Sequence, residues 1–346
     1  MDNFNFIKTD DGSVGLYSDI ANDILHSKTG ALKEANEKFI NPAKHILKKN
    51  KNLKILDICS GVGYNLKGAL LNLQYKEATI DCLDINKTYI LLSPIIQDGI
   101  NDLDMKIFIL SEILRCGFSL DEIYSLILKI EEKGLVEFLY PNMSNFIKYI
   151  KKEVYKTFPD VIQSTFLHNI YYKYISNSMK DCLETNKYER ISINFKVGDA
   201  RESLKISNFF YDIVFLDGFT PQKDPTLWTI DFLRLIKTKM NKNSILTSYS
   251  KSTPFRSALL NLNFHVGKTF LDNIDMGTVA SINPCNINSP LNEYDIKLFQ
   301  TRSGIPYKDS NLNLFSSQIL LNREIEQKKS NKQSHTSFLK EQRNIL

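Results

Sequence analysis

A chain of 346 residues, 42% of them hydrophobic, is long enough to bury a sizeable core, and its net charge of +5 permits an anionic partner without requiring one. The N-terminal residues form no apolar signal region, and no apolar run approaches the roughly 18 residues of a membrane span. The five cysteines are scattered without a C-x-x-C pair, which indicates neither a disulfide framework nor a zinc site. We therefore expect a cytoplasmic protein that binds no metal and no membrane.

The first part of the chain predicts two strands that flank a glycine turn and a helix. A helical pattern covers residues 32–39 and is followed by Pro42. The apolar run 53–58 predicts a strand, and a helix over 65–73 and a strand over 78–83 come next. Strand, glycine turn, helix and strand in this order favour a parallel α/β sheet.

Residues 87–190 carry helical periodicity and little strand signal, so we predict an inserted helical subdomain there. Within it, Gly117 ends one helix, and Ser119 with Glu122 resembles a capping box that begins the next. Strands resume afterwards at 191–197, 211–216 and 244–249, with a helix over 227–240 and a closing hairpin over 263–283.

The predicted fold is a Rossmann-like α/β domain with a mostly parallel seven-stranded sheet, which a terminal hairpin closes. Its two halves would be residues 1–86, with the N-terminal segment, and residues 191–322. The insertion 87–190 separates them, and we expect the polar residues 323–346 to form a flexible tail.

A first candidate ligand site follows the strand 53–58. Gly61 and Gly63 let a ligand approach the backbone, and the helix that follows offers free N–H groups. Cys59 stands where a G-x-G-x-x-G motif has its first glycine, which disfavours a pyrophosphate site. The carboxylate of Asp57 suits a ligand with an amino-acid group, although a plain glycine turn is an equally simple interpretation.

Two further acidic positions follow neighbouring strands. Asp84 lies some 20 residues beyond the glycines, where an acidic side chain accepts hydrogen bonds from ribose hydroxyls. Asp199 and Ala200 follow the strand 191–197, near the place of an adenine amino group. Alone, each position reads as an ordinary loop or turn, so the interpretation depends on the whole series.

The strongest candidate for chemistry is Asp217, which the apolar strand 211–216 delivers to the carboxyl edge of the sheet. A carboxylate there can orient an amine and accept its proton, and Phe219 offers a ring to a cationic centre. Pro221 stiffens the exit from the turn. The alternative is an N-cap aspartate beside a core phenylalanine.

Four segments together resemble the methyltransferase part of the MnmC family: 215–229, 10–18, 26–32 and 302–309. The resemblance implies a methyltransferase that uses S-adenosyl-L-methionine to methylate 5-aminomethyl-(2-thio)uridine at the tRNA wobble position, with Asp217 at the reaction centre. It also implies a pocket covered or bordered by a further group of residues: Tyr17, Ser18, His26, Ser27, Pro221 and Lys223.

The chain lacks a second glycine fingerprint, so we expect no FAD, and an oxidoreductase acting earlier on the nucleoside would be a separate protein. Two segments depart from the family pattern besides Cys59: residues 272–276 lack an expected basic pattern, and 87–190 match nothing in it. Alternatives are a methyltransferase acting on a small-molecule or protein amine, and a non-catalytic RNA-binding protein. The basic residues expected to meet RNA are Lys223, Arg302, Lys308, Lys328, Lys329 and Lys332.

Overall fold

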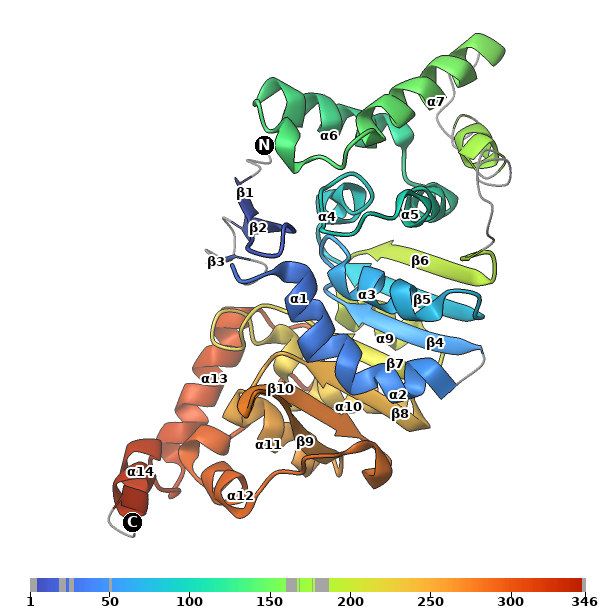
Figure 1. Cartoon of the computed structure of the whole chain (residues 1–346). Coiled ribbons are helices and arrows are strands. Elements are labelled where there is room, and N and C mark those ends of the chain that lie inside the picture. The colour runs from blue at the N-terminus through green and yellow to red at the C-terminus, as the bar shows by residue number, and fades with distance from the viewer. Residues whose placement is uncertain are drawn as a thin grey trace. The chain divides into compact units, whose positions relative to one another are not determined.

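The computed structural model describes residues 5–18, 23–24, 28–49, 52–159, 167, 169–175, 177 and 187–343. The chain divides into two compact units, one of Met1–Asn36 with Leu47–Gly198 and one of Glu37–Ile46 with Asp199–Leu346. Seven strands make up a mostly parallel sheet with helices around it, which confirms the predicted Rossmann-like α/β class (Figure 1).

The first unit holds three parallel strands in the order β6-β5-β4. They are β4 (Leu53–Ile58), β5 (Ala78–Asp84) and β6 (Ile191–Val197), at the predicted positions. Helix α3 (Tyr64–Leu73) connects β4 to β5 and is buried along nearly its whole length. This parallel arrangement brings the carboxyl ends of β4 and β5 to one edge, where the glycine turn and Asp84 follow them.

The segment between β5 and β6 is helical where the structure describes it, as the sequence predicts. The capping box of Ser119 and Glu122 is present at the start of α6, and Gly117 before it has a φ of +92°. The elements here are α4 (Lys87–Leu92), α5 (Leu103–Arg115), α6 (Leu120–Glu132), the 3₁₀ turn η2 (Val136–Phe138) and α7 (Met143–Thr157).

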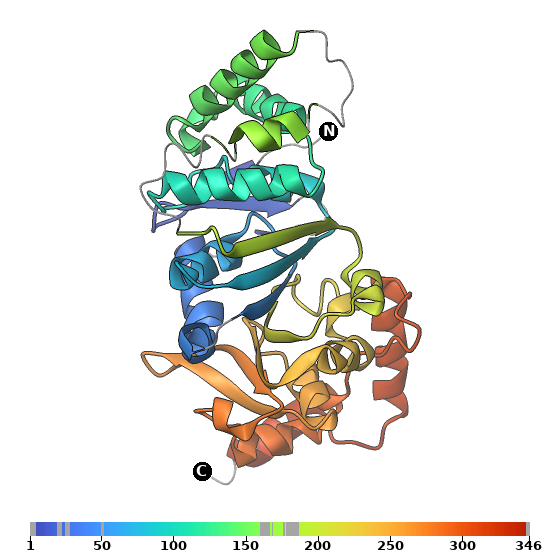
Figure 2. The ribbon, with the colours of Figure 1, turned by 90° about the vertical axis from the view of Figure 1, so that its right-hand side faces the viewer.

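Helix α5 covers the free edge of β6 (Figure 2). The Glu112 carboxylate accepts the Ile193 N–H at 2.7 Å, and the Arg115 guanidinium donates to the Ile193 carbonyl at 2.7 Å. The Cys116 sulfur accepts the Phe195 N–H at 3.3 Å. These side chains satisfy edge groups that would otherwise be open to pairing with another strand. The sheet edge therefore depends on the helical segment. Strand β6 belongs to the first compact unit, which ends at Gly198.

The N-terminal residues of the first unit form a small antiparallel sheet of β1 (Asn5–Lys8), β2 (Val14–Ser18) and β3 (Asp23–Ile24). The chain then continues as helix from α1 (Ala31–Ala35) through the π-turn η1 (Asn36–Ile40) into α2 (Asn41–Lys49). The helical backbone continues beyond Pro42, which lies in the first turn of α2 directly after the π-helix η1.

The second unit holds four strands in the order β7-β8-β10-β9: β7 (Tyr211–Leu216), β8 (Met240–Ser248), β9 (His265–Leu271) and β10 (Ile274–Ser281). The last two form the predicted antiparallel hairpin, whose turn residues Asp272 and Asn273 have φ values of 49° and 66°. In the segment that lacks the expected basic pattern, the Asp275 carboxylate pairs with Arg256 at 2.9 Å.

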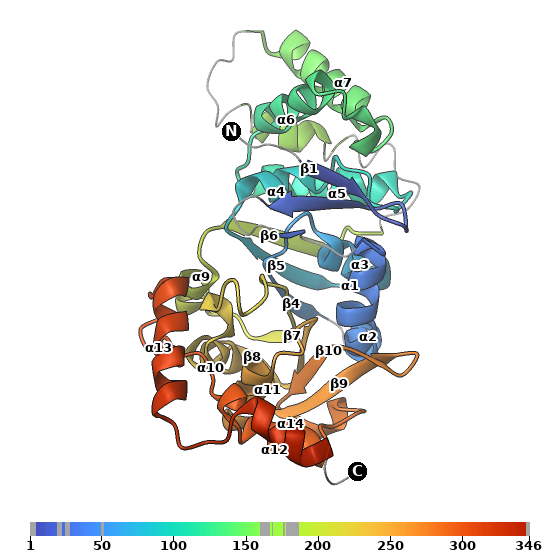
Figure 3. The same cartoon turned by 90° about the vertical axis from the view of Figure 1, so that its left-hand side faces the viewer.

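Helices surround these strands and extend to the end of the described chain. Helices α10 and α11 lie side by side (Figure 3). The Tyr294 ring of α12 meets the Phe338 ring of α14 with 5.6 Å between ring centroids. The elements are α9 (Ala200–Ile206), η3 (Thr226–Trp228), α10 (Ile230–Thr238), α11 (Thr253–Asn261), η4 (Pro284–Asn286), α12 (Glu293–Phe299), η5 (Arg302–Gly304), α13 (Ser316–Lys329) and α14 (His335–Arg343).

The expectation of a flexible tail over 323–346 is wrong for residues 323–329 and 335–343, which belong to α13 and α14. Arg323 holds α13 in place, donating to the carbonyl oxygens of Ile305 at 2.7 Å and Ser303 at 3.0 Å. The sequence pattern does not predict these helices, because each has few buried apolar side chains. Ile319 is the one buried residue of α13, and Phe338 is buried on α14. A polar helix with so narrow an apolar contact resembles a disordered tail in composition.

Candidate active site

The turn after β4 has an unusual backbone. Cys59, Gly61 and Gly63 all have positive φ values, of 61°, 53° and 83°. Cys59 therefore adopts the left-handed conformation that the expected glycine would adopt. This conformation costs free energy in a residue with a side chain, and the backbone hydrogen bond of Cys59 offsets that cost. Its N–H donates to the Leu83 carbonyl at 2.8 Å. The departure at Cys59 changes the side chain and keeps the glycine-like shape of the turn.

Asp84 ties the glycine turn to the end of β5. One carboxylate oxygen accepts the Gly61 N–H at 2.8 Å, and the other accepts the Asn86 N–H at 2.8 Å. Burial raises the pKa of this carboxyl, and the backbone donors lower it in part. Because each oxygen retains a further lone pair, Asp84 can accept hydrogen bonds from a ribose while it holds the turn.

Asp57 is fully buried beneath this turn. Burial raises its pKa to about 7, an effect that Asp84 reinforces and the nearby Asn65 amide and Leu66 N–H partly offset. Its carboxylate faces the Asn65 amide and the Leu66 N–H, whereas the buried hydroxyls of Ser60 and Ser93 have no hydrogen-bond partner among the described residues. Unsatisfied polar groups this deeply buried indicate a place for a polar ligand. An amino-acid end, such as that of S-adenosyl-L-methionine, fits such a set of acceptors and donors.

A buried ionic cluster contacts the glycine turn at the Val62 carbonyl. Lys67 of α3 donates to the Val62 carbonyl at 3.1 Å and contacts the Asp98 carboxylate at 2.9 Å. Lys106 of α5 pairs with the same Asp98 oxygen, and all three side chains have no exposed surface. Burial and the charge of Lys67 lower the pKa of Lys106 to about 7. Sequence reasoning missed this cluster, since three charges in separate elements look like ordinary surface residues.

The N-terminal sheet is attached to the same helix. The Tyr64 hydroxyl donates to the Val14 carbonyl and accepts the Val14 N–H, both at 2.9 Å. Tyr17 lies in β2 and is half-buried, while Ser18 is described only as backbone at the end of that strand. His26 and Ser27 lie outside the described residues. Of the predicted pocket residues in this region, Tyr17 and Ser18 are thus on a strand fixed to the helix after the glycine turn.

In the second unit, Asp199 is the N-cap of α9 and accepts the Arg201 N–H at 2.8 Å. The Arg201 guanidinium also pairs with the Asp199 carboxylate at 2.7 Å and with Asp309 at 2.9 Å. Ala200, the first residue of α9, is buried. Sequence reasoning missed Arg201, which joins the predicted adenine position to the family-like segment 302–309.

The turn after β7 is held at two consecutive carbonyls. The Tyr249 hydroxyl donates to the Gly218 carbonyl at 2.8 Å, and the Trp228 indole donates to the Phe219 carbonyl at 2.7 Å. The two donors meet edge to face, with 6.1 Å between ring centroids. Asp217 is partly exposed between the buried residues Leu216 and Gly218. These two hydrogen bonds fix the backbone of the turn that presents Asp217.

The remaining predicted residues of this turn differ in exposure. Phe219 is half-buried, Pro221 is buried and Lys223 is exposed, with its N–H donating to the Thr220 carbonyl at 2.8 Å. Sequence reasoning missed Tyr249 as a support of the turn. Its place directly after β8, at the same carboxyl edge as Asp217, was the signal that could have identified it.

Comparisons with known proteins point to a methyltransferase. A profile described as S-adenosyl-L-methionine-dependent methyltransferase matches residues 163–270. The uncharacterized protein MJ0670 of Methanocaldococcus jannaschii is 32% identical over 321 residues, which cover 92% of this chain and 71% of that protein. The crystal structure of MNMC2 from Aquifex aeolicus has the same fold, with a TM-score of 0.62 and 24% identity over 95% of this chain and 87% of that one.

Shorter matches involve the tRNA 5-methylaminomethyl-2-thiouridine biosynthesis bifunctional protein MnmC. The Delftia acidovorans protein is 30% identical over 79 residues, which are 23% of this chain and 12% of that protein. The Campylobacter concisus protein is 28% identical over 135 residues, which are 39% and 19% of the two chains. The matched segments thus span less than a fifth of these bifunctional proteins.

Fold, glycine turn and profile together define an S-adenosyl-L-methionine-dependent methyltransferase. Within that class, the chain belongs to the family of MnmC-like methyltransferases, as its motifs predict. No helix in the described ranges is long and apolar enough to cross a membrane. The described residues also contain no cluster of three His, Cys, Asp or Glu side chains able to hold a metal ion.

Gly63 gives a direct test of the predicted cofactor site at the glycine turn after β4. We expect Gly63→Ala to abolish measurable binding of S-adenosyl-L-methionine, because a Cβ would lie 2.6 Å from the Ser93 hydroxyl at a φ of +83°. Isothermal titration calorimetry measures the affinity, and circular dichroism checks the fold. Cys59→Gly is the matched control, since it relaxes a left-handed residue and should leave binding intact. Full affinity in Gly63→Ala would contradict a cofactor site at this turn.

Proposed function

We propose that this protein transfers a methyl group from S-adenosyl-L-methionine to the exocyclic amine of 5-aminomethyl-(2-thio)uridine at the tRNA wobble position, giving the 5-methylaminomethyl form. The observation that carries the proposal is the rigid turn that presents Asp217, whose carbonyls are held by Tyr249 and Trp228. The names of the MnmC relatives support tRNA as the substrate.

S-adenosyl-L-methionine supplies an electrophilic methyl group on a sulfonium. The neutral amine attacks that carbon, so a C–N bond forms, the C–S bond breaks, and S-adenosylhomocysteine leaves. We assign Asp217 the task of orienting the amine N–H groups and accepting the proton that the nitrogen loses. Phe219 would stabilise the cationic centre through its ring, and Pro221 would fix the exit of the turn.

The cofactor would lie along the turns described above. Asp57, Gly61 and Gly63 would border its amino-acid end, and Asp84 would accept hydrogen bonds from the ribose. The residues that complete the proposed cofactor and substrate pocket are Asp199, Ala200, Tyr17, Ser18, His26, Ser27 and Lys223. In this scheme the protein acts in the cytoplasm, on a nucleoside that a separate oxidoreductase has processed beforehand.

Mass spectrometry of tRNA nucleosides from a deletion strain tests the substrate and the reaction together. We expect 5-aminomethyl-2-thiouridine to accumulate and the methylated nucleoside to disappear, and the wild-type gene should reverse both changes. An unchanged nucleoside profile would refute the tRNA assignment even if the purified protein binds S-adenosyl-L-methionine.

A second candidate is a methyltransferase that acts on an amine of a small molecule or a protein. The observation that favours it is that the bifunctional MnmC proteins named for tRNA modification match only 23% and 39% of this chain. Binding of tRNA distinguishes the two, because phosphate contacts make RNA affinity fall steeply with salt. A protein that binds RNA and never transfers a methyl group would instead be a non-catalytic member of the family.

A further inference from the structure

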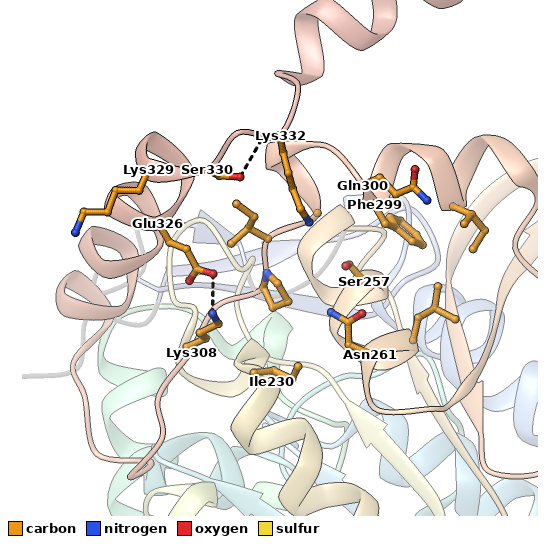
Figure 4. A pocket seen from close by; sticks show the side chains of 15 residues that line it. Ile230, Ser257, Asn261, Phe299, Gln300, Lys308, Glu326, Lys329, Ser330 and Lys332 are labelled. Atoms are coloured by element: carbon orange, nitrogen blue, oxygen red, sulfur yellow. Dashed lines mark hydrogen bonds and ion pairs between the residues drawn. The ribbon is translucent and has the colours of Figure 1, made fainter.

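The second unit contains a cavity of about 680 Å³ that none of the predicted cofactor or catalytic residues lines (Figure 4). Its apolar surface includes Ile230 at the start of α10, Phe299 at the end of α12, and Ile305. Ser257 and Asn261 of α11 line another side. The volume falls within the roughly 300–1,000 Å³ of sites that bind small organic groups.

The charged groups around this cavity are mostly basic. Glu326 is the acidic residue in the lining, and its carboxylate pairs with Lys308 at 2.6 Å. Lys329 points away from the cavity, whereas Lys332 extends from the rim toward Phe299 and Ser257 (Figure 4). Among the described residues the Lys332 ammonium has no side-chain or backbone partner, so this exposed group brings an uncompensated positive charge to the rim of the cavity.

The backbone that carries Lys332 is fixed in place. The Arg302 N–H donates to the Gln333 carbonyl, and the Arg302 guanidinium donates to the Lys332 carbonyl, both at 2.9 Å. The Gln327 amide donates to the Arg302 carbonyl at 2.9 Å. Gly304 permits this arrangement, because a side chain there would collide with the Phe299 carbonyl. A rim ordered before binding reduces the entropy that a ligand must overcome.

The chemistry of the lining matches a nucleotide. Lys332 can hold a phosphate, apolar surface at Phe299 and Ile230 can contact a base, and the amides of Asn261 and Gln300 can pair with its donors and acceptors. We propose that this cavity binds one nucleotide of an RNA strand. With tRNA as that strand, the proposal rests on the proposed function and assigns part of the substrate contact to α11–α13 rather than to the Asp217 turn.

Lys332→Gln tests the site directly. We expect it to weaken tRNA binding about tenfold, the effect of one lost charge-assisted hydrogen bond. It should also reduce the slope of log affinity against log salt by about 1. Fluorescence anisotropy with labelled tRNA at several salt concentrations measures both quantities. Lys297→Gln is the matched control, because it removes the same charge from an exposed position of α12 outside the cavity.

Equal tRNA affinity and salt slope in the Lys332→Gln and Lys297→Gln variants would overturn the proposal. Titration with uridine monophosphate distinguishes the source of the nucleotide: if that compound binds through Lys332 and tRNA does not bind at all, the RNA strand is the wrong occupant. The assay does not depend on methylation. A wild-type protein that binds tRNA through Lys332 but leaves it unmethylated would retain this site and refute the proposed reaction.

Discussion

Asp98→Asn is expected to lower the free energy of unfolding by about 3–5 kcal/mol, because it leaves buried lysines without their counter-ion. Asp98 pairs with both Lys67 and Lys106, and none of the three side chains has exposed surface. Burial alone would raise the pKa of Asp98, but the two ammonium groups hold it below its usual value. Chemical denaturation followed by circular dichroism measures the loss.

The pH dependence of this loss separates a charge effect from a packing defect. Burial lowers the pKa values of both lysines, so their proton uptake favours the unfolded state. Asp98 raises the pKa of both lysines, so without it the folded variant binds fewer of their protons than the folded wild type, whereas the unfolded chain still binds them up to about pH 10. The deficit of the variant should therefore shrink from pH 7 toward pH 10, by up to about 1.4 kcal/mol per pH unit for each additional proton. A deficit that stays constant with pH would contradict this explanation.

The same cluster connects stability to the glycine turn, the predicted cofactor site, since Lys67 also donates to the Val62 carbonyl. A triple variant, Lys67→Met with Asp98→Asn and Lys106→Met, removes the charges together and should recover much of the lost stability. It should nevertheless bind S-adenosyl-L-methionine more weakly than wild type, because the turn loses its support from below. Calorimetry on the folded triple variant tests this, and wild-type affinity would show that the cluster serves stability alone.

The sequence predicted the strands well because their patterns are local. Runs such as 53–58 and 211–216 are apolar throughout, as strands buried on both faces must be, and the structure has β4 and β7 at those residues. The capping box at Ser119 was equally local and is present. The helices α13 and α14 were missed because their stability depends on contacts with distant residues, such as those of Arg323 with Ile305.

The candidate site was predictable only in part, for the same reason. Glycines and acids at strand ends can be read from spacing, and the structure has the glycine turn, Asp84 and Asp217 at the ends of β4, β5 and β7, while their roles stay predictions. Their supports are contacts between residues far apart in the chain, such as Lys67 with Asp98 and Tyr249 with Gly218. At Cys59 the residue type departs from the motif, but the backbone conformation remains that of glycine.

Asp217→Asn is expected to lower kcat for methyl transfer by about 10²–10⁴, the range for loss of a general base, and to leave the affinity for S-adenosyl-L-methionine unchanged. An asparagine side chain keeps the size of Asp217 and can still accept a hydrogen bond from the amine, but it takes up no proton. Radiolabelled methyl transfer to undermethylated tRNA measures the rate. A variant that retains the wild-type rate and tRNA content would exclude Asp217 from the chemistry.

Tyr249→Phe is the companion variant, because it removes only the hydroxyl that donates to the Gly218 carbonyl at 2.8 Å. We expect a smaller loss in kcat, about fivefold, since one hydrogen bond positions the turn and its removal costs about 1 kcal/mol. The losses of kcat from Asp217→Asn and Tyr249→Phe should be less than additive in the double variant. Tyr249 acts by orienting the Asp217 carboxylate, so its hydroxyl contributes little once that carboxylate has been removed. Full additivity would mean that Tyr249 acts independently of Asp217, and the rigid turn would then need another explanation.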